Sequence, residues 1–196
     1  MKRLAGDGDL WRRSQEGDAQ AFGRLFDRYA NPIYAYCFRR TADWAVAEDL
    51  TSVVFLEAWR KRGKVTLADG TVGPWLYGVA SNVLRNQRRS LRRYRGALER
   101  LPGLQPERDF ADDVVERVER AQRMQDVLAV LRLLPKAEQD ALTLCDWQGL
   151  SAKEAADALG VPEATIRTRL FRARRRFRES LYSPPVQQNE VVPKEG

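Results

Sequence analysis

The densest run of chemically active side chains lies near the C-terminal end, in the stretch TIRTRLFRARRRFRES from Thr165 to Ser180. Eight of its sixteen residues are charged, and seven of these are arginines. A guanidinium group donates paired hydrogen bonds to phosphate or guanine, so the run suits an anionic partner, although it could also only keep a helix soluble. Apolar residues recur at helical spacing in and just after this stretch, at Ile166, Leu170, Phe177 and Leu181. They predict a helix that docks on a core through one face.

Catalytic and metal chemistry is limited by the residue types that the chain lacks. It has no histidine, which excludes Ser-His-Asp and Cys-His catalysis and zinc sites with histidine ligands. Cys37 and Cys145 are too few for a four-thiolate site and imply no disulfide framework. Asp112 and Asp113 could in principle hold a metal, but an acidic linker is the interpretation that we favour. We therefore expect no catalytic residue, no metal and no cofactor.

The bulk composition points to the class of partner. The chain has 196 residues and a formal net charge of +7, which favours an anionic partner such as nucleic acid or a membrane surface. No apolar run approaches the roughly 18 residues of a membrane span. The N-terminal stretch MKRLAGDGDLWRRSQEGD lacks the apolar segment of a secretory signal. The expectation is a cytoplasmic protein without membrane insertion.

The spacing of apolar residues predicts an all-α protein, because they recur at three and four and strand signals are almost absent. In the first half we expect helices over residues 21–29, 32–40 and 45–62, and one from residue 74 onward. Asn31-Pro32 is expected to separate the first two, since proline disfavours a helical residue before it. In the second half we expect helices over residues 114–134, 137–147 and 152–159, and one from residue 162 onward.

The predicted helix over residues 45–62 carries more apolar surface than a single core-facing stripe needs. Its core face is formed by Ala47, Leu50, Val54 and Ala58. Phe55 and Trp59, spaced four apart, extend this face around one side, and Val46 and Val53 extend it on the other. The excess indicates either a partner protein or a neighbouring helix that covers it, and the residues alone leave these two alternatives equal.

A polar line follows the exposed side of the helix that begins at Pro74. Asn82, Arg85, Arg89 and Arg92 are spaced three, four and three apart. Such a line can track phosphates while the amide reads base edges. A solvated basic face is the alternative and, for this line taken alone, the better interpretation.

A helix-turn-helix is predicted in the second half. Ser151 and Glu154 form a capping box, Gly160 supplies a turn, and Pro162 begins the arginine-rich helix. The second helix of this motif lies in a major groove, where arginine can donate to guanine, glutamate can accept from cytosine and threonine can touch thymine. An αα-hairpin with a basic exterior is the alternative, and DNA binding is favoured over it. The remaining arginines of this helix are expected to contact phosphates or stay solvated: Arg169, Arg174, Arg175, Arg176 and Arg178.

Three segments together resemble the extracytoplasmic-function (ECF) sigma factors of bacterial RNA polymerase. AEDLTSVVFLEAWR, from Ala47 to Arg60, is similar to the segment of this family that binds core polymerase. GPWLYGVASNVLRNQRR, from Gly73 to Arg89, is similar to the segment that reads and melts the −10 element. The stretch from Leu134 to Glu179 is similar to the −35-binding domain. The loop from Gly63 to Gly73 matches the place where the family holds a flipped −10 base.

The resemblance implies two small helical domains on a flexible linker. It places a region 2-like domain at residues 15–96, a linker at 97–115, a region 4-like helix-turn-helix domain at 116–182 and a disordered tail at 183–196. It implies a non-enzymatic function, binding core RNA polymerase and directing promoter-specific initiation through −10 and −35 recognition. The partners would be core RNA polymerase, promoter DNA and a separate anti-sigma factor. A stand-alone helix-turn-helix regulator and an enzyme acting on nucleic acid are the rival interpretations.

The resemblance also implies roles for individual residues. Those that match the polymerase-binding segment are Glu48, Asp49, Leu50, Phe55 and Trp59. Those that match the −10-contacting segment are Lys64, Asn82, Arg85, Asn86 and Arg89. Those that match the −35 recognition helix are Glu163, Thr165, Arg167, Thr168, Arg169 and Arg172.

Overall fold

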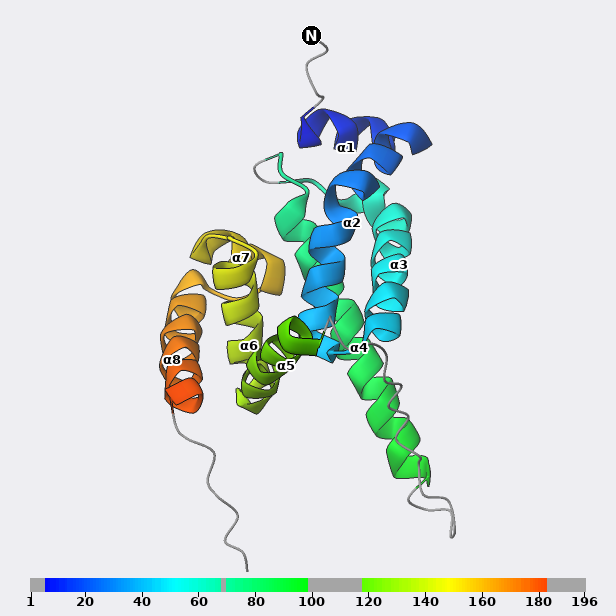
Figure 1. Cartoon of the computed structure of the whole chain (residues 1–196). Helices are drawn as coiled ribbons and strands as arrows, with labels where there is room; N and C mark the ends of the chain where they lie inside the picture. The colour runs from blue at the N-terminus through cyan, green and yellow to red at the C-terminus, as the bar shows by residue number, and fades with distance from the viewer. Residues whose placement is uncertain (1–5, 68–69, 99–117, 183–196) are drawn as a thin grey trace, which may run out of the picture.

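Residues 6–67, 70–98 and 118–182 are described in the computed structural model, and most of them lie in helices (Figure 1). The α-helices are α1 (Asp7–Gln15), α2 (Ala19–Thr41), α3 (Trp44–Lys61), α4 (Gly73–Leu98), α5 (Val118–Leu133), α6 (Lys136–Leu142), α7 (Ala152–Leu159) and α8 (Glu163–Tyr182). A 3₁₀ turn (Arg62–Lys64) follows α3, and a π-helical turn (Thr143–Trp147) follows α6. No strand occurs within the three described ranges, and the all-α prediction is confirmed.

Helix α2 runs through Pro32 without a break, so the predicted separation at Asn31-Pro32 is wrong. A proline inside a helix removes one backbone hydrogen bond and costs about 3 kcal/mol. On either side of it, however, Leu25, Ile33 and Tyr36 are fully buried. Burying a large apolar side chain contributes about 1.5–3 kcal/mol, so the packing of the whole helix outweighs the cost of one proline.

Helix α1 packs at one end of α2 and precedes the first helix expected from the sequence, which was to begin at Ala21 (Figure 1). Its Leu10 and Trp11 are buried in the main core, and the Trp11 ring lies 4.8 Å from that of Trp75. Asp7, in its first turn, accepts hydrogen bonds from the Tyr29 hydroxyl and the Val72 backbone N–H. This helix therefore ties the N-terminal end of the core to the start of α4.

The second half contains the predicted helix-turn-helix. The Ser151 side chain accepts from the Glu154 N–H and the Glu154 carboxylate accepts from the Ser151 N–H, which confirms the capping box at the start of α7. Gly160 ends α7 with a φ of 64°, a left-handed conformation that glycine adopts without steric cost. The helix predicted over residues 137–147 instead changes to a π-helical turn at Thr143. On α5, Leu128 and Leu131 are fully buried, whereas Met124 is 44% exposed.

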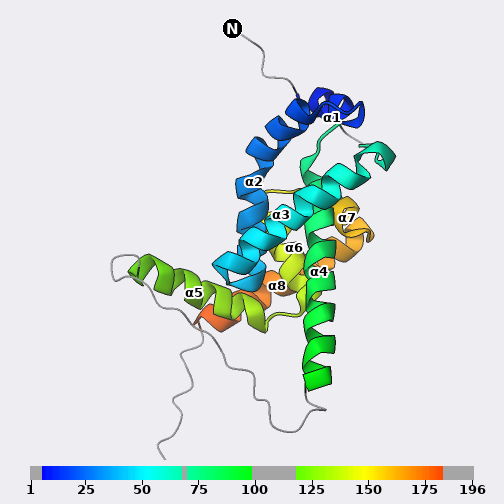
Figure 2. The ribbon, with the colours of Figure 1, turned by 90° about the vertical axis from the view of Figure 1, so that its right-hand side faces the viewer.

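The two helical halves share one apolar core. Leu144, Ala155 and Ile166 from the second half belong to the same buried cluster as Leu76 and Tyr77 of α4. Helices α4 and α7 lie side by side in both views (Figures 1 and 2). The contact is close, and a Cβ added at Gly78 of α4 would lie 2.6 Å from the Ala158 carbonyl oxygen. The linker predicted at residues 97–115 lies outside the described residues from 99 onward, and so does the tail at 183–196.

A polar contact joins α2 to α6 beside this core. The Arg40 side chain is 1% exposed and forms an ion pair of 2.8 Å with Asp140. It also donates to the Gln139 side chain at 2.8 Å. A buried charge is tolerated only when it is paired and hydrogen-bonded, so this contact favours the arrangement in which α2 and α6 lie together.

Candidate nucleic-acid interface

The outer face of α8 presents the residues expected to read DNA. Arg167, Thr168 and Arg172 are exposed, while Glu163, Thr165 and Arg169 are half-buried. The Arg167 guanidinium pairs with the Glu163 carboxylate at 2.6 Å, one helical turn away. This exposed pair contributes at most about 1 kcal/mol to stability, so it can open when a base edge or phosphate competes for the arginine.

Two arginines of α8 hold the helix in place. Arg176 donates to both oxygens of Glu138 on α6, at 2.9 and 3.0 Å. Arg174 pairs with Asp146 in the π-helical turn, and this hydrogen bond raises the pKa of Arg174. Both side chains remain exposed, at 54% for Arg174 and 44% for Arg176, as expected for solvated charges, but each also has an acidic partner that was not expected. Such cross-helix pairs could not be found by spacing along a single helix.

The apolar side of α8 differs from its predicted stripe at one end. Ile166 and Ala173 are fully buried, and Leu170 and Phe177 are half-buried. Leu181 is 47% exposed, so it does not continue the core-facing stripe. Ala173 was missed because alanine contributes little to a hydrophobic pattern, although its small size suits the close packing against α5 and α6.

The polar line on α4 is exposed as expected. Asn82, Arg85, Asn86 and Arg89 all face solvent, and the C-terminal turns of α4 project beyond the other helices (Figures 1 and 2). A line of amide and guanidinium groups on a projecting helix can follow a nucleic-acid backbone while the asparagines reach bases.

The loop before α4 rests on α1. The Gln15 side-chain amide donates to the carbonyl oxygens of Arg62 and Val65, at 2.8 and 2.9 Å, and the Trp11 indole donates to Val65 at 3.4 Å. A cavity of about 190 Å³ lies between α1 and this loop. Lys64, expected near the −10 DNA, is exposed but does not line this cavity. Sequence reasoning missed Trp11 and Gln15, although apolar Leu10 and Trp11 behind two acidic residues are typical of a short helix.

Helix α3 divides its apolar residues between the core and the surface. Leu50 and Phe55 are each only 5% exposed, so they pack inside this chain. Trp59 is half-buried, with its ring 5.0 Å from Phe22 and the Arg62 guanidinium 3.4 Å above it. A neighbouring helix therefore covers part of the excess apolar surface.

The rest of that surface is exposed, and it includes the predicted Val53. Leu56 is 59% exposed, and Phe26 and Val53 are 43% exposed each. The acidic side chains of Glu48 and Asp49 are exposed on the same helix as Leu56. We call Phe26, Val53 and Leu56 the α2–α3 apolar patch. The residues expected to bind polymerase lie on α3, those expected to contact −10 DNA lie on α4 and just before it, and those expected to contact −35 DNA lie on α8. Figure 1 shows α3 and α8 on opposite sides of the molecule.

Comparisons with known proteins agree with this architecture. Residues 25–94 match the family model "Sigma-70 region 2", and residues 124–177 match "Sigma-70, region 4". The chain is 38% identical over 181 residues to the ECF RNA polymerase sigma factor BldN of Streptomyces coelicolor, covering 88% of this chain and 67% of BldN. It is 30% identical to the RNA polymerase sigma-H factor of Pseudomonas aeruginosa, covering 89% of this chain and 93% of that protein.

Two solved structures share the fold. CnrH in complex with the cytosolic domain of CnrY aligns with a TM-score of 0.67 and 21% identity, over 89% of this chain and 96% of that chain. The sigma factor RpoE in complex with the anti-sigma factor NepR from Bartonella quintana aligns with a TM-score of 0.65 and 22% identity, over 83% of this chain and 98% of that chain. The chain belongs to the ECF sigma factors of bacterial RNA polymerase, which act in transcription initiation.

Within the described ranges, no helix has the length and apolar character needed to cross a bilayer. The same ranges contain no group of three or more cysteine, aspartate or glutamate side chains that could hold a metal ion.

Proposed function

We propose that this chain binds core RNA polymerase and directs promoter-specific initiation by recognising −10 and −35 elements. The observation that carries the proposal is the helix-turn-helix, in which Ile166 and Ala173 anchor α8 while Arg167, Thr168 and Arg172 face solvent. An αα-hairpin with no DNA to bind would bury the same apolar residues, but it would not need so many arginines on the outer face of its second helix. The chain would be a non-catalytic, dissociable subunit that acts in the cytoplasm, and catalysis would belong to the polymerase.

The proposed division of labour follows the expected domains. Residues 15–96 would bind polymerase and contact the −10 element, and residues 116–182 would contact the −35 element. The two sigma-70 matches fall inside these ranges, which supports the assignment. The projecting line on α4 would lie along single-stranded −10 DNA, and the cavity between α1 and the following loop would accept an unstacked base.

Polymerase binding is proposed for the α2–α3 apolar patch together with Glu48 and Asp49. Its residues are exposed, whereas Leu50 and Phe55 would shape the surface only from beneath. A central apolar contact with charges at its rim is typical of protein interfaces. Leu56→Ser should weaken binding to purified core polymerase about tenfold or more, because it removes a central apolar contact. Leu133→Ser, at a 75% exposed leucine on α5, is the matched control and should leave the affinity unchanged.

A separate anti-sigma factor is also proposed as a partner. CnrH was solved with the cytosolic domain of CnrY, and RpoE with the anti-sigma factor NepR, and both share this fold. Such a regulator could bind across the two packed halves and so keep the promoter-binding surfaces of α4 and α8 from moving apart.

The deciding experiment combines this protein with purified core polymerase, first in a pull-down and then in run-off transcription from a promoter library. Stable binding and core-dependent transcripts that share a −35/−10 pattern are expected. Tight binding to a duplex by the protein alone, without binding to core, would instead favour a stand-alone regulator and reject the proposal.

A further inference from the structure

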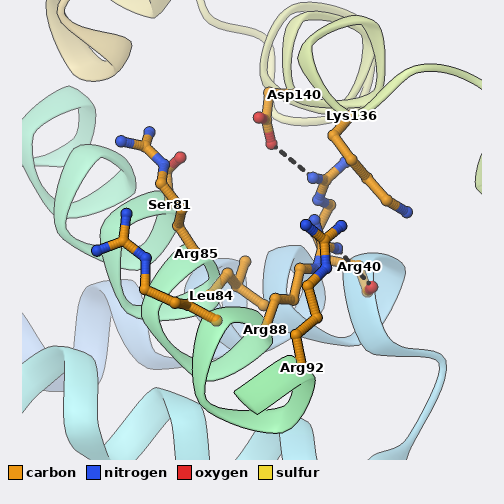
Figure 3. A pocket seen from close by; sticks show the side chains of 9 residues that line it. Arg40, Ser81, Leu84, Arg85, Arg88, Arg92, Lys136 and Asp140 are labelled. Atoms are coloured by element: carbon orange, nitrogen blue, oxygen red, sulfur yellow. Dashed lines mark hydrogen bonds and ion pairs between the residues drawn. The ribbon is translucent and has the colours of Figure 1, made fainter. Parts of the chain in front are cut away.

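A cavity of about 310 Å³ lies where α4 of the first half meets α6 of the second (Figure 3). Leu84 and Ser81 of α4 form part of its wall. Its other lining side chains are six cations and one carboxylate: Arg40, Arg85, Arg88, Arg89, Arg92, Lys136 and Asp140. The sequence gives no sign of this grouping, because Arg40, the α4 arginines and Lys136 are brought together only by the packing of the two halves.

The positive charge of the cavity is not balanced from within. Asp140 is already committed to Arg40, at 2.8 Å, so one carboxylate faces six cations. Arg85, Arg89, Arg92 and Lys136 form no ion pair with any carboxylate in the described part of the chain. The cavity therefore holds a net charge of five in a partly enclosed space.

The cations destabilise one another as a result. Burial lowers the pKa of Arg88, and the neighbouring charge of Arg40 lowers it further. Burial also lowers the pKa of Lys136, and Arg88 and Arg40 add to the effect. The Arg40 Nε is buried and has no acceptor among the described residues. An anion in the cavity would relieve this repulsion.

The geometry favours phosphate over other anions. Figure 3 shows Arg88 and Arg92 extending from α4 toward Arg40 and Asp140, with Lys136 on the α6 side of the same space. Guanidinium groups bind phosphate oxygens in pairs. The volume equals that of about ten liquid waters, which is room for a few phosphate groups but not for a folded peptide segment.

We propose that this cavity binds a small anion that carries two or three phosphate groups, and that it does so only while the two halves are packed together. Lys136 and Asp140 come from α6, so separation of the halves removes one wall of the site. By linkage, an anion that binds only the packed arrangement stabilises it. Binding of a phosphate-rich solute at this site would thus oppose the separation of the two halves. This effect is additional to promoter recognition.

The test uses the full chain and inorganic triphosphate in magnesium-free buffer, followed by calorimetric titration and by thermal unfolding. Saturable binding of one anion per chain and a rise in Tm are expected. Lys136→Ala should weaken binding about tenfold, because it removes the second-half cation but leaves the α4 line intact. Arg24→Ala, at an exposed arginine of α2 outside the cavity, should bind as the unaltered protein does. Unsaturable binding, or equal binding by Lys136→Ala, would overturn the proposal.

A second titration separates a free anion from a DNA backbone as the source of the phosphates. A single-stranded oligothymidylate should compete with triphosphate for the α4 arginines, yet its own affinity should not depend on Lys136. If the oligonucleotide instead loses affinity with Lys136→Ala as much as triphosphate does, the cavity is part of a DNA path and the small-anion site is rejected. Binding of triphosphate does not depend on promoter recognition, so either proposal can fail without the other.

Discussion

The Cys37 thiol is an example of what burial does to a single residue. It is fully buried, and burial raises its pKa from 9.0 to about 12, although a hydrogen bond with Thr51 acts in the opposite direction. Between these two values the unfolded chain loses the thiol proton while the folded chain keeps it. The free energy of unfolding should therefore fall as pH rises from about 9 to 12, by up to about 1.4 kcal/mol per pH unit from this group.

The check is urea unfolding at several pH values between 7 and 11, with Cys37→Ala for comparison. Below pH 8 the two proteins should differ by a constant amount that reflects packing. Above pH 9 the variant should lose stability less steeply. Parallel curves across the whole range would show that the thiol does not contribute to the alkaline transition.

At the same scale, Arg172 and Arg175 are predicted to behave differently although both are exposed on α8. If Arg172 donates twice to one base, Arg172→Ala should cost about 1–3 kcal/mol at the cognate −35 site and little elsewhere. Arg175→Ala should weaken binding to all sequences equally and reduce the salt dependence. Competition binding of the polymerase complex to matched and mutated promoters measures both, and an equal loss for Arg172→Ala on every sequence would reassign it to the phosphates.

Among the elements, α7 begins at the position that its sequence predicts because its signals are local. The Ser151 hydroxyl and the Glu154 carboxylate satisfy backbone and side-chain donors in the first turn, and these bonds lower the pKa of Glu154. Ser151→Ala should cost about 1 kcal/mol in the free energy of unfolding. Ser90→Ala, at an exposed position inside α4, should have no cost or a slight benefit. Equal effects of the two changes in denaturant unfolding would contradict the role of the cap.

Elements whose limits depend on distant packing could not be predicted in the same way. Pro32 is a local break signal, yet α2 continues because Leu25 and Ile33 are buried on either side of it. Helix α1 is too short to stand out by periodicity and is held by contacts with Arg62, the first residue of the 3₁₀ turn, and with Val65 of the loop. Capping boxes, turn glycines and long amphipathic stripes are visible in the sequence, whereas such tertiary contacts are not.

The same contrast between local signals and tertiary contacts explains which site residues could be predicted. Exposed polar residues such as Asn82 and Arg172 were predicted correctly as exposed, because a charged residue opposite an apolar stripe faces solvent. Leu50 is buried, as its place on the predicted core face implies, whereas Phe55 was expected to extend that face and is buried because Phe22 and Phe26 of α2 pack against its ring. The ion pairs of Arg174 and Arg176 were missed because their acidic partners lie 28 and 38 residues away.

For the whole molecule, the packed halves conflict with simultaneous contact to two promoter elements. Elements centred about 25 base pairs apart are separated by roughly 85 Å along B-DNA. A compact chain of this length has a radius of gyration of about 16 Å, so its diameter is about half that separation. The proposed function therefore requires α4 and α7 to part, with loss of the Arg40–Asp140 pair and of the shared core.

Gly78 allows the packed arrangement and provides its test. An added Cβ would lie 2.6 Å from the Ala158 carbonyl oxygen, which belongs to backbone and cannot move aside alone. In an exposed helix interior, glycine to alanine stabilises by about 1 kcal/mol, and Gly23→Ala on α2 should do so because nothing lies within 4 Å of its added Cβ. Gly78→Ala should have the opposite sign, lowering the unfolding midpoint or opening the molecule.

Small-angle scattering should then show a larger radius of gyration for Gly78→Ala and no change for Gly23→Ala. If both variants are stabilised and equally compact, α4 and α7 do not pack this closely in solution, and promoter binding requires no opening step at this contact.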